Sequence, residues 1–354
     1  MNRIGYCFLV LNIILLSSCS SISDDHDRVY NAVEVYNDFW RSYDLYYANF
    51  FVKSLDWDAV YEKYRSRIDK QTNDEILYQI LTEIEQKELK DGHSYIAQTK
   101  EYLISYQPKR VGFDDSYLVS ERYYTNEVDI LDSKMEFIEY GFVKPELTVG
   151  SGLIGYLRVK AFMPDNELQS FGQFKSEVDK AMNLLRSTSS IIIDVRNNRG
   201  GYSPWSEYLA GYFTLTSGEY MIEKVRYNDN RMDLKVIKNS FVVSTSSNFV
   251  YDGNCTVLMN RLTASAAEIF VVAMKRLSQV TTIGTRTFGI FSPSMYRELV
   301  NGWYVRIPVS DVRLPNGISY EGVGISPDIK MKNVSLSSFE DPALIKAINH
   351  ANKN

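Results

Sequence analysis

A serine and an acid three residues later stand where a strand-like run of residues gives way to a helix-like run. The segment is Thr263-Ala264-Ser265-Ala266-Ala267-Glu268. A helix N-terminus presents unpaired backbone N–H groups and a partial positive charge, so a nucleophilic Ser265 would have oxyanion donors nearby, with the N–H of Ala266 as the first candidate. The same spacing satisfies the S-x-x-E capping box, in which the serine merely starts the helix. The local pattern leaves both interpretations open.

A serine nucleophile needs a base, and the chain contains three histidines. His26 and His350 lie near the two ends of the chain, whereas His93 follows a helix-like segment in Asp91-Gly92-His93. A lone histidine in such a turn is often structural, so both a structural role and the role of the base are open for His93. Glu321, in a loop specified by glycine and proline, is a candidate for a carboxylate that orients an imidazole. By itself it is simply a loop acid.

The first residues have the features of a processing signal and are set apart from the fold. A positive charge, an apolar run over residues 6–16 and small residues precede Cys19. The run is shorter than the ~20 residues of a membrane-spanning helix. We expect a bacterial lipoprotein signal peptide over residues 1–18, lipidation of Cys19 and a polar tether over residues 19–29. The alternative is an ordinary secretory signal with an incidental cysteine.

Lipidation would fix the location of the protein. The residue after Cys19 is Ser20 and not aspartate, so we expect a lipid-anchored protein of the bacterial cell envelope, in the outer membrane, on its periplasmic or surface face. The expected contact with the membrane is through the lipid anchor alone.

Composition excludes several classes of function. The net charge of −5 comes without a basic block, which argues against nucleic acid as a partner. Cys7 would leave with the signal peptide and Cys19 would carry lipid, so Cys255 has no partner for an internal disulfide. No Cys/His cluster has zinc-site spacing, and we expect neither a metal nor another cofactor.

Hydrophobic periodicity divides the rest of the chain and predicts an α/β protein. Residues 30–99 indicate an N-terminal helical subdomain, residues 100–150 a small β-rich insert, residues 151–335 a catalytic core of alternating strands and helices, and residues 336–354 a C-terminal helix. Within the core we expect strands at 153–159, 190–195, 256–260 and 280–283, and helices at 168–186, 205–214 and 264–277.

Three motifs, taken in order, resemble those of the tail-specific (C-terminal processing) serine peptidases. They are D-x-R-x-N-x-G-G at Asp194–Gly201, the serine segment Thr263–Phe270, and G-x-x-T-x-G at Gly284–Gly289. The resemblance implies a ClpP/crotonase-like α/β core and hydrolysis of peptide bonds through an acyl-enzyme on Ser265. It also implies an oxyanion hole formed by the N–H of Ala266 with that of Gly200 or Gly201.

One departure from this family pattern concerns the base. The Ser/Lys branch carries its lysine directly after the last glycine, where this chain has Ile290, which cannot accept a proton. The branch that includes the tricorn protease uses serine, histidine and glutamate. In that branch the histidine ends a short D-G-H-like element and the glutamate precedes a G-V-x-P-D element. His93 and Glu321 occupy the matching positions here. The resemblance therefore implies a Ser265–His93–Glu321 triad.

A second departure concerns the substrate. Many relatives carry a PDZ domain before the core, but residues 100–150 are too few for a complete one, so the resemblance does not carry over the recognition of a free C-terminus. The expected partner is a peptide or polypeptide substrate. Two other functions remain open, a non-catalytic peptide- or ligand-binding lipoprotein of the same fold and an esterase or amidase for small substrates.

Overall fold

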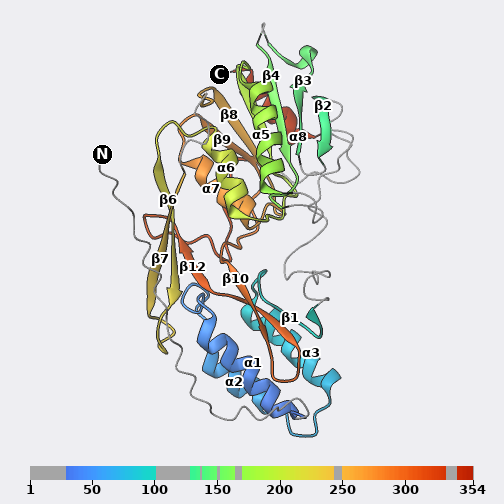
Figure 1. The fold of residues 1–354 in the computed structure, drawn as a ribbon, viewed down its shortest axis with the longest axis vertical. Helices are drawn as coiled ribbons and strands as arrows, with labels where there is room; N and C mark the ends of the chain where they lie inside the picture. Colours follow the sequence, from blue (N-terminus) through green and yellow to red (C-terminus); the bar gives the residue numbers. More distant parts are fainter. Residues whose placement is uncertain are drawn as a thin grey trace, which may run out of the picture.

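The computed structural model describes residues 29–100, 128–135, 138–149, 152–163, 170–242, 249–331 and 341–353. They form two lobes in Figure 1: a large lobe around the main sheet and a smaller helical lobe, with a long hairpin running beside both. The expected signal peptide, Cys19 and nearly all of the tether lie outside the described residues, as does about half of the expected insert. Within the described residues no helix is long and apolar enough to cross a membrane.

The described residues form the following helices and strands, in chain order. The helices are α1 (Ala32–Tyr46), α2 (Trp57–Arg65), α3 (Asp74–Ile84), the π-helix η1 (Glu85–Leu89), the 3₁₀ turn η4 (Pro145–Leu147), α5 (Phe171–Leu185), α6 (Ser203–Gly211), α7 (Ala266–Lys275) and α8 (Pro342–Ala351). The strands are β1 (Tyr95–Ala97), β2 (Val128–Met135), β3 (Ile138–Val143), β4 (Ile154–Val159), β5 (Ser190–Asp194), β6 (Gly218–Arg226), β7 (Leu234–Val242), β8 (Asn254–Met259), β9 (Val280–Gly284), β10 (Ser294–Glu298), β11 (Tyr304–Pro308), β12 (Ser310–Arg313) and β13 (Ile329–Lys330).

The main sheet has seven strands in the order β13-β9-β8-β5-β4-β3-β2. Its β4, β5, β8, β9 and β13 are parallel, and β3 and β2 add antiparallel at one edge. The α/β prediction is confirmed. The described part of the expected insert is not separate from the core, because β3 pairs with β4 and extends the same sheet.

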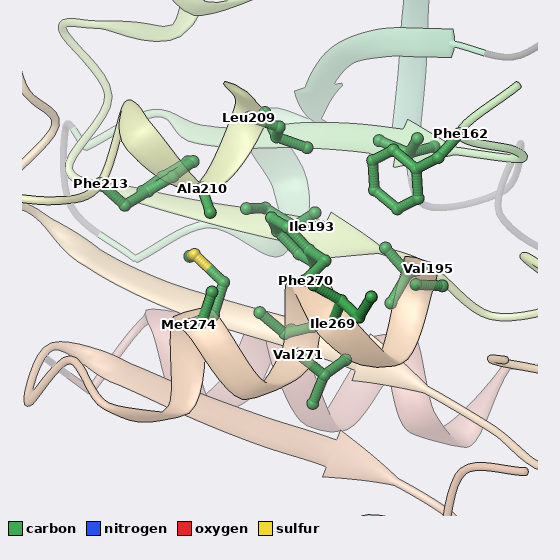
Figure 2. Close-up of a cluster of buried hydrophobic side chains, with 14 of the residues drawn as sticks. Phe162, Ile193, Val195, Leu209, Ala210, Phe213, Ile269, Phe270, Val271 and Met274 are labelled. Carbon is green, nitrogen blue, oxygen red and sulfur yellow. The ribbon is translucent and has the colours of Figure 1, made fainter. Parts of the chain in front are cut away.

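Both faces of the main sheet are buried, which explains why its central strands are apolar throughout. Successive side chains of a strand point to opposite faces, so Ile191 and Ile193 pack under α5, α6 and α7 while Ile192 faces α8. Figure 2 shows Ile193 of β5 close to Leu209 of α6 and Phe270 of α7.

The helical lobe has its own core, in which aromatic side chains of α1 and α2 pack against α3 and strand β11. Side-chain caps define its helices: Asn31 forms a capping box with Glu34 at α1, and Asp56 and Asn73 accept N–H bonds at α2 and α3. The sheet β1-β11-β10 belongs to this lobe. Residues 294–308, which the sequence assigned to the core, therefore return to the helical lobe and pair with β1.

The helical segment formed by α3 and η1 departs from regular geometry near its end. After α3 the chain widens into η1, and Lys90 then takes a left-handed conformation with φ 47°. Glu85, at the start of η1, is buried and binds the hydroxyl groups of Tyr43 and Ser94. The π-helical turn thus directs an acid into the lobe interior, immediately before the turn that carries His93.

The first family motif is a structural network. Arg196 lies against Asp194 at 2.6 Å and Asp341 at 2.7 Å, and all three side chains are buried. Burial opposes ionisation of Asp194, but the guanidinium outweighs it and the pKa of Asp194 lies below its usual range. Asp341 also caps α8 through the N–H of Leu344, so the network fastens the C-terminal helix to the end of β5. An unpaired charge here would cost about 3–5 kcal/mol.

Candidate active site

Ser265 occupies a strained turn between β8 and α7. Its backbone has φ 55° and ψ −123°, which non-glycine residues rarely adopt. Two hydrogen bonds hold the loop before Ser265. Thr263 donates its hydroxyl to the carbonyl of Val195 at 2.8 Å, and the N–H of Ala264 donates to the carbonyl of Asn198 at 3.0 Å. The strain of such a conformation is on the order of 1–3 kcal/mol and concentrates at functional sites.

The predicted capping role explains only part of this turn. The N–H of Ser265 donates to Glu268 Oε2 at 3.1 Å, as a capping box requires, and the N–H of Glu268 donates to the carbonyl of Ser265 at 2.8 Å. An ordinary serine cap keeps an extended backbone and needs no positive φ. The unusual conformation resembles the elbow that exposes a nucleophile at the top of a sheet.

Glu268 does more than start the helix. It is fully buried, and besides Ser265 it accepts hydrogen bonds from the Thr287 hydroxyl at 2.6 Å and from the N–H groups of Gly289 and Ile290 at 2.6 and 2.8 Å. Burial raises its pKa to about 7, although these four donors act in the opposite direction. The carboxylate ties the start of α7 to the loop after β9. The S-x-x-E pattern alone does not predict the hydrogen bonds of Glu268 with Thr287, Gly289 and Ile290.

The two glycines of the first motif lie against this turn. A Cβ on Gly200 would stand 2.7 Å from both the Ser265 Cβ and the Ala264 carbonyl oxygen, and φ is +101°, so only glycine fits. The N–H of Gly200 already donates to Asn198 Oδ1 at 2.9 Å. Of the two alternatives left by the sequence, Gly201 therefore keeps its N–H as the candidate oxyanion donor, together with that of Ala266.

Ser265 and His93 line one cavity of about 400 Å³. His93 comes from the helical lobe and Ser265 from the core, so the cavity lies where the lobes meet. Gly200 and Gly201 also line it, together with side chains that the sequence did not single out. These are Lys160, Ala161, Met163, Asn197, Arg199, Tyr202, Tyr296 and Arg306.

His93 is held in one orientation by both lobes. Its N–H donates to Asp91 Oδ1 at 3.0 Å within the helical lobe, and its Nδ1 lies 2.7 Å from the carbonyl oxygen of Ser292. A carbonyl can only accept, so Nδ1 carries the proton and Nε2 is the unprotonated nitrogen of the neutral imidazole. This tautomer is the one that a general base requires.

Glu321 binds the backbone on the Ser292 side of the His93–Ser292 hydrogen bond. Its Oε2 accepts the N–H groups of Phe291 and Ser292 at 2.8 and 3.0 Å, so it fixes the peptide whose carbonyl holds the imidazole. Burial, and then the neighbouring charge of Asp91, raise the pKa of Glu321. The role of Glu321 as the third member of the triad stays a prediction. Its hydrogen bonds would let it orient the imidazole through the backbone of Ser292.

Comparison with known proteins bears on this arrangement. The model of peptidase family S41 matches residues 153–331, just over half of the chain. The chain belongs to peptidase family S41. Residues 31–84 of the helical lobe match the tricorn protease C1 domain, which agrees with the branch that Asp91-Gly92-His93 resembles.

Individual relatives are distant. A probable CtpA-like serine protease of Staphylococcus haemolyticus is 29% identical over 186 residues, covering 52% of this chain and 35% of that protein. The chain therefore spans about a third of the length of the curated relatives it matches. A putative peptidase from Parabacteroides merdae has a TM-score of 0.73 at 23% identity, covering 91% of this chain and 97% of its own.

The shared fold extends to enzymes with named roles. The photosystem II D1 C-terminal processing protease has a TM-score of 0.56 at 15% identity and covers 92% of this chain and 99% of its own. At such identities the structural likeness establishes the fold alone. The ClpP/crotonase-like α/β prediction agrees with these S41 structures.

The departure from the Ser/Lys branch of S41 has a physical counterpart. Ile290, at the position of that lysine, is buried with Phe288 and Ala264. A Cβ on Gly92 would approach Phe288 Cε1 to 2.5 Å and Ile290 Cγ2 to 2.9 Å. The apolar side chain and the missing side chain of Gly92 let the His93 turn sit against the loop where the lysine would otherwise be.

A second buried acid near His93 makes stability depend on pH. Burial raises the pKa of Glu85 to about 8 from an ordinary value of 4.5, and the Ser94 and Tyr43 hydroxyls only partly offset this. Between these two pH values the folded protein holds a proton that the unfolded chain has lost. The Glu85 contribution to stability is therefore present below about pH 4.5 and is lost as pH rises toward about 8.

We expect Glu85→Gln to flatten this dependence, because glutamine has the same shape and does not titrate. The free energy of unfolding from urea titrations at several pH values in this window should fall less steeply in the variant, by up to about 1.4 kcal/mol per pH unit. The control is Glu83→Gln at the surface of α3, where Arg67 and Lys87 lower the pKa to about 2 and the linkage lies outside the window. Equal slopes for wild type and Glu85→Gln would contradict the assignment.

Proposed function

We propose that this chain is a serine peptidase that hydrolyses peptide bonds through an acyl-enzyme, with Ser265 as nucleophile and His93 as base. The observation that carries the proposal is the shared cavity of Ser265 and His93, in which the serine has a strained backbone and the histidine has its Nδ1 on a carbonyl. Either feature alone has a structural explanation. Their meeting from two separate lobes favours catalysis.

The proposed reaction begins when Nε2 of His93 takes the Ser265 hydroxyl proton as Oγ attacks the peptide carbonyl. The resulting oxyanion accepts hydrogen bonds from the N–H groups of Ala266 and Gly201, where each such donor is worth roughly 10²–10³ in rate. Protonated His93 gives its proton to the leaving amine, and an ester on Ser265 remains. Water, deprotonated by His93, then attacks this ester; the Ser265 oxygen leaves and receives that proton from His93, which releases the acid and restores the serine.

Glu321 acts as a positioning residue in this proposal. A charge that develops on His93 during the reaction strengthens its hydrogen bond to the Ser292 carbonyl, and Glu321 keeps that peptide in place through the N–H groups of Phe291 and Ser292. The substrate class is a short or unfolded peptide, since the cavity lies between lobes and is lined partly by backbone. The partner and the fine specificity are part of the proposal.

A fluorophosphonate probe tests the nucleophile directly. We expect the wild type to be labelled, Ser265→Ala to be unlabelled, and His93→Gln to be labelled at least about 10²-fold more slowly because the base is lost. Ser66→Ala, in the helical lobe, is the control and should react like the wild type. Absence of labelling from about pH 6 to about pH 9 would favour the non-catalytic binding protein. Labelling with turnover of simple esters but not peptides would favour the esterase.

The glycine at the serine turn allows a second test. Gly200→Ala introduces a methyl group 2.7 Å from the Ser265 Cβ, so we expect labelling to fall by about 10²-fold or more. Gly302→Ala is a matched control, because Gly302 also has a positive φ of +80° but no neighbouring atom within 4 Å. It should lose stability slightly through strain and keep full reactivity. Equal reactivity of the two variants would exclude a close Gly200–Ser265 contact.

We also propose that the chain is anchored in the cell envelope by lipid on Cys19, and this rests on the sequence pattern before residue 20. Several acyl chains are needed for stable membrane attachment. In bacteria fed an alkyne-tagged fatty acid, the full chain should become labelled and sediment with membranes, whereas Cys19→Ala should do neither. The control is Cys255→Ala, at a buried free cysteine, which should behave like the wild type. Label retained by Cys19→Ala would overturn the lipobox.

A further inference from the structure

The cavity that contains Ser265 and His93 is lined by positive charge. Lys160, Arg199 and Arg306 contribute to it, and none of its lining residues is an aspartate or a glutamate. The whole chain carries a net charge of −5, so the charge of the cavity lining is opposite in sign to that of the protein. Local positive charge at a substrate site favours a negatively charged group on the ligand.

Among these cations, Arg306 is held in place by neighbouring side chains on both sides and by a hydrogen bond. It lies in the middle strand β11, directly opposite Tyr95 of β1 and Tyr296 of β10, so the three side chains form one row across the sheet. Its guanidinium lies 5.7 Å from the Tyr95 ring centre and 5.8 Å from that of Tyr296. Its Nε donates to the Ser294 hydroxyl at 2.5 Å, and its carbonyl accepts from Tyr43 at 3.2 Å.

This cation lacks the acidic partner that others have. Lys160 pairs with Glu139 at 2.7 Å, and Arg297, in the neighbouring strand, pairs with Asp38 at 2.8 Å. Across the described part of the chain, Arg306 makes no ion pair with a carboxylate. Its Nε and its ring contacts fix the plane of the group, and the outer N–H groups have the geometry to hold a planar anion at two points.

We propose that Arg306 binds a carboxylate of the peptide substrate in this cavity. The carboxylate has two possible sources, an acidic side chain or the free C-terminus, and both present the same planar pair of oxygens. The inference rests on the proposed function for the ligand being a peptide, but it does not need the peptide to be cleaved. Arg306 is thus a specificity-determining residue, placed by the strand that also adjoins the His93 turn.

The test uses the full chain as Ser265→Ala, so that peptides bind without being hydrolysed. Fluorescent peptides are compared by anisotropy in two matched pairs: an internal glutamate against glutamine with both ends blocked, and a free C-terminus against its amide. We expect the charged member of one pair to bind about tenfold tighter, as a charge-assisted hydrogen bond at a partly exposed site provides. The pair that shows this preference identifies the source of the carboxylate.

Two variants in that background assign the effect. Arg306→Gln should lose the preference and keep its affinity for the neutral peptides, which also reports that the cavity is intact. Arg306→Lys keeps the charge without the fork and should retain only part of the preference. Arg199→Gln removes another cation from the same cavity and should keep the preference.

The proposal fails if neither charged peptide is preferred, or if Arg199→Gln and Arg306→Gln lose the preference equally. In the latter case the positive potential of the cavity and not Arg306 would be responsible. The outcome is independent of catalysis. If the binding preference depends on Arg306 but a fluorophosphonate does not label the wild-type protein, the carboxylate site is upheld and the peptidase proposal is rejected.

Discussion

The hydrogen bond between His93 Nδ1 and the carbonyl of Ser292 is the constraint on which the site depends. It joins the turn after the N-terminal helices to the chain that leaves the catalytic core, and it sets which imidazole nitrogen has a lone pair. Everything around it fixes one of its two ends. Asp91 holds the N–H of His93, while Glu321 holds the N–H of Ser292 and the N–H of Ser310 binds the Ser292 hydroxyl. Shifting either lobe would therefore move the imidazole.

Buried carboxylates that bind backbone N–H groups recur through this region. Glu268 fastens the serine turn, Glu321 fastens the Ser292 peptide, and Asp91 fastens the histidine turn while also accepting from Tyr47. Backbone amides are fixed donors and bring no flexible side chain, so they position a loop more rigidly than a lysine would. The arrangement has a cost, because burial raises the pKa of Glu268 and Glu321 and part of the stability is spent on keeping these acids away from water.

The sequence predicts what is local. The α/β alternation, the apolar central strand β5 and the helix after Ser265 follow from periodicity and end signals, and the structure confirms them. The return of residues 294–308 to pair with β1 was missed, because pairing over 200 residues of chain leaves no local pattern. For the same reason Ser292 and Arg306 gave no signal as site residues. The hydrogen bond from the N–H of Gly200 to Asn198, which favours Gly201 as the candidate oxyanion donor, likewise has no local sequence signal.

Ile290 illustrates how one substitution in a site requires another elsewhere. A lysine base in the Ser/Lys branch would come from the same loop as Ile290, so such a base needs no second lobe. With an isoleucine buried there, the candidate base His93 lies on a turn of the helical lobe, and the absence of a side chain on Gly92 lets this turn approach Phe288 and Ile290. The site then exists only where the helical lobe docks against the core. Strands β10 and β11 make that docking part of the chain's own topology, because they leave the core directly after Ser292 and form the sheet that carries β1.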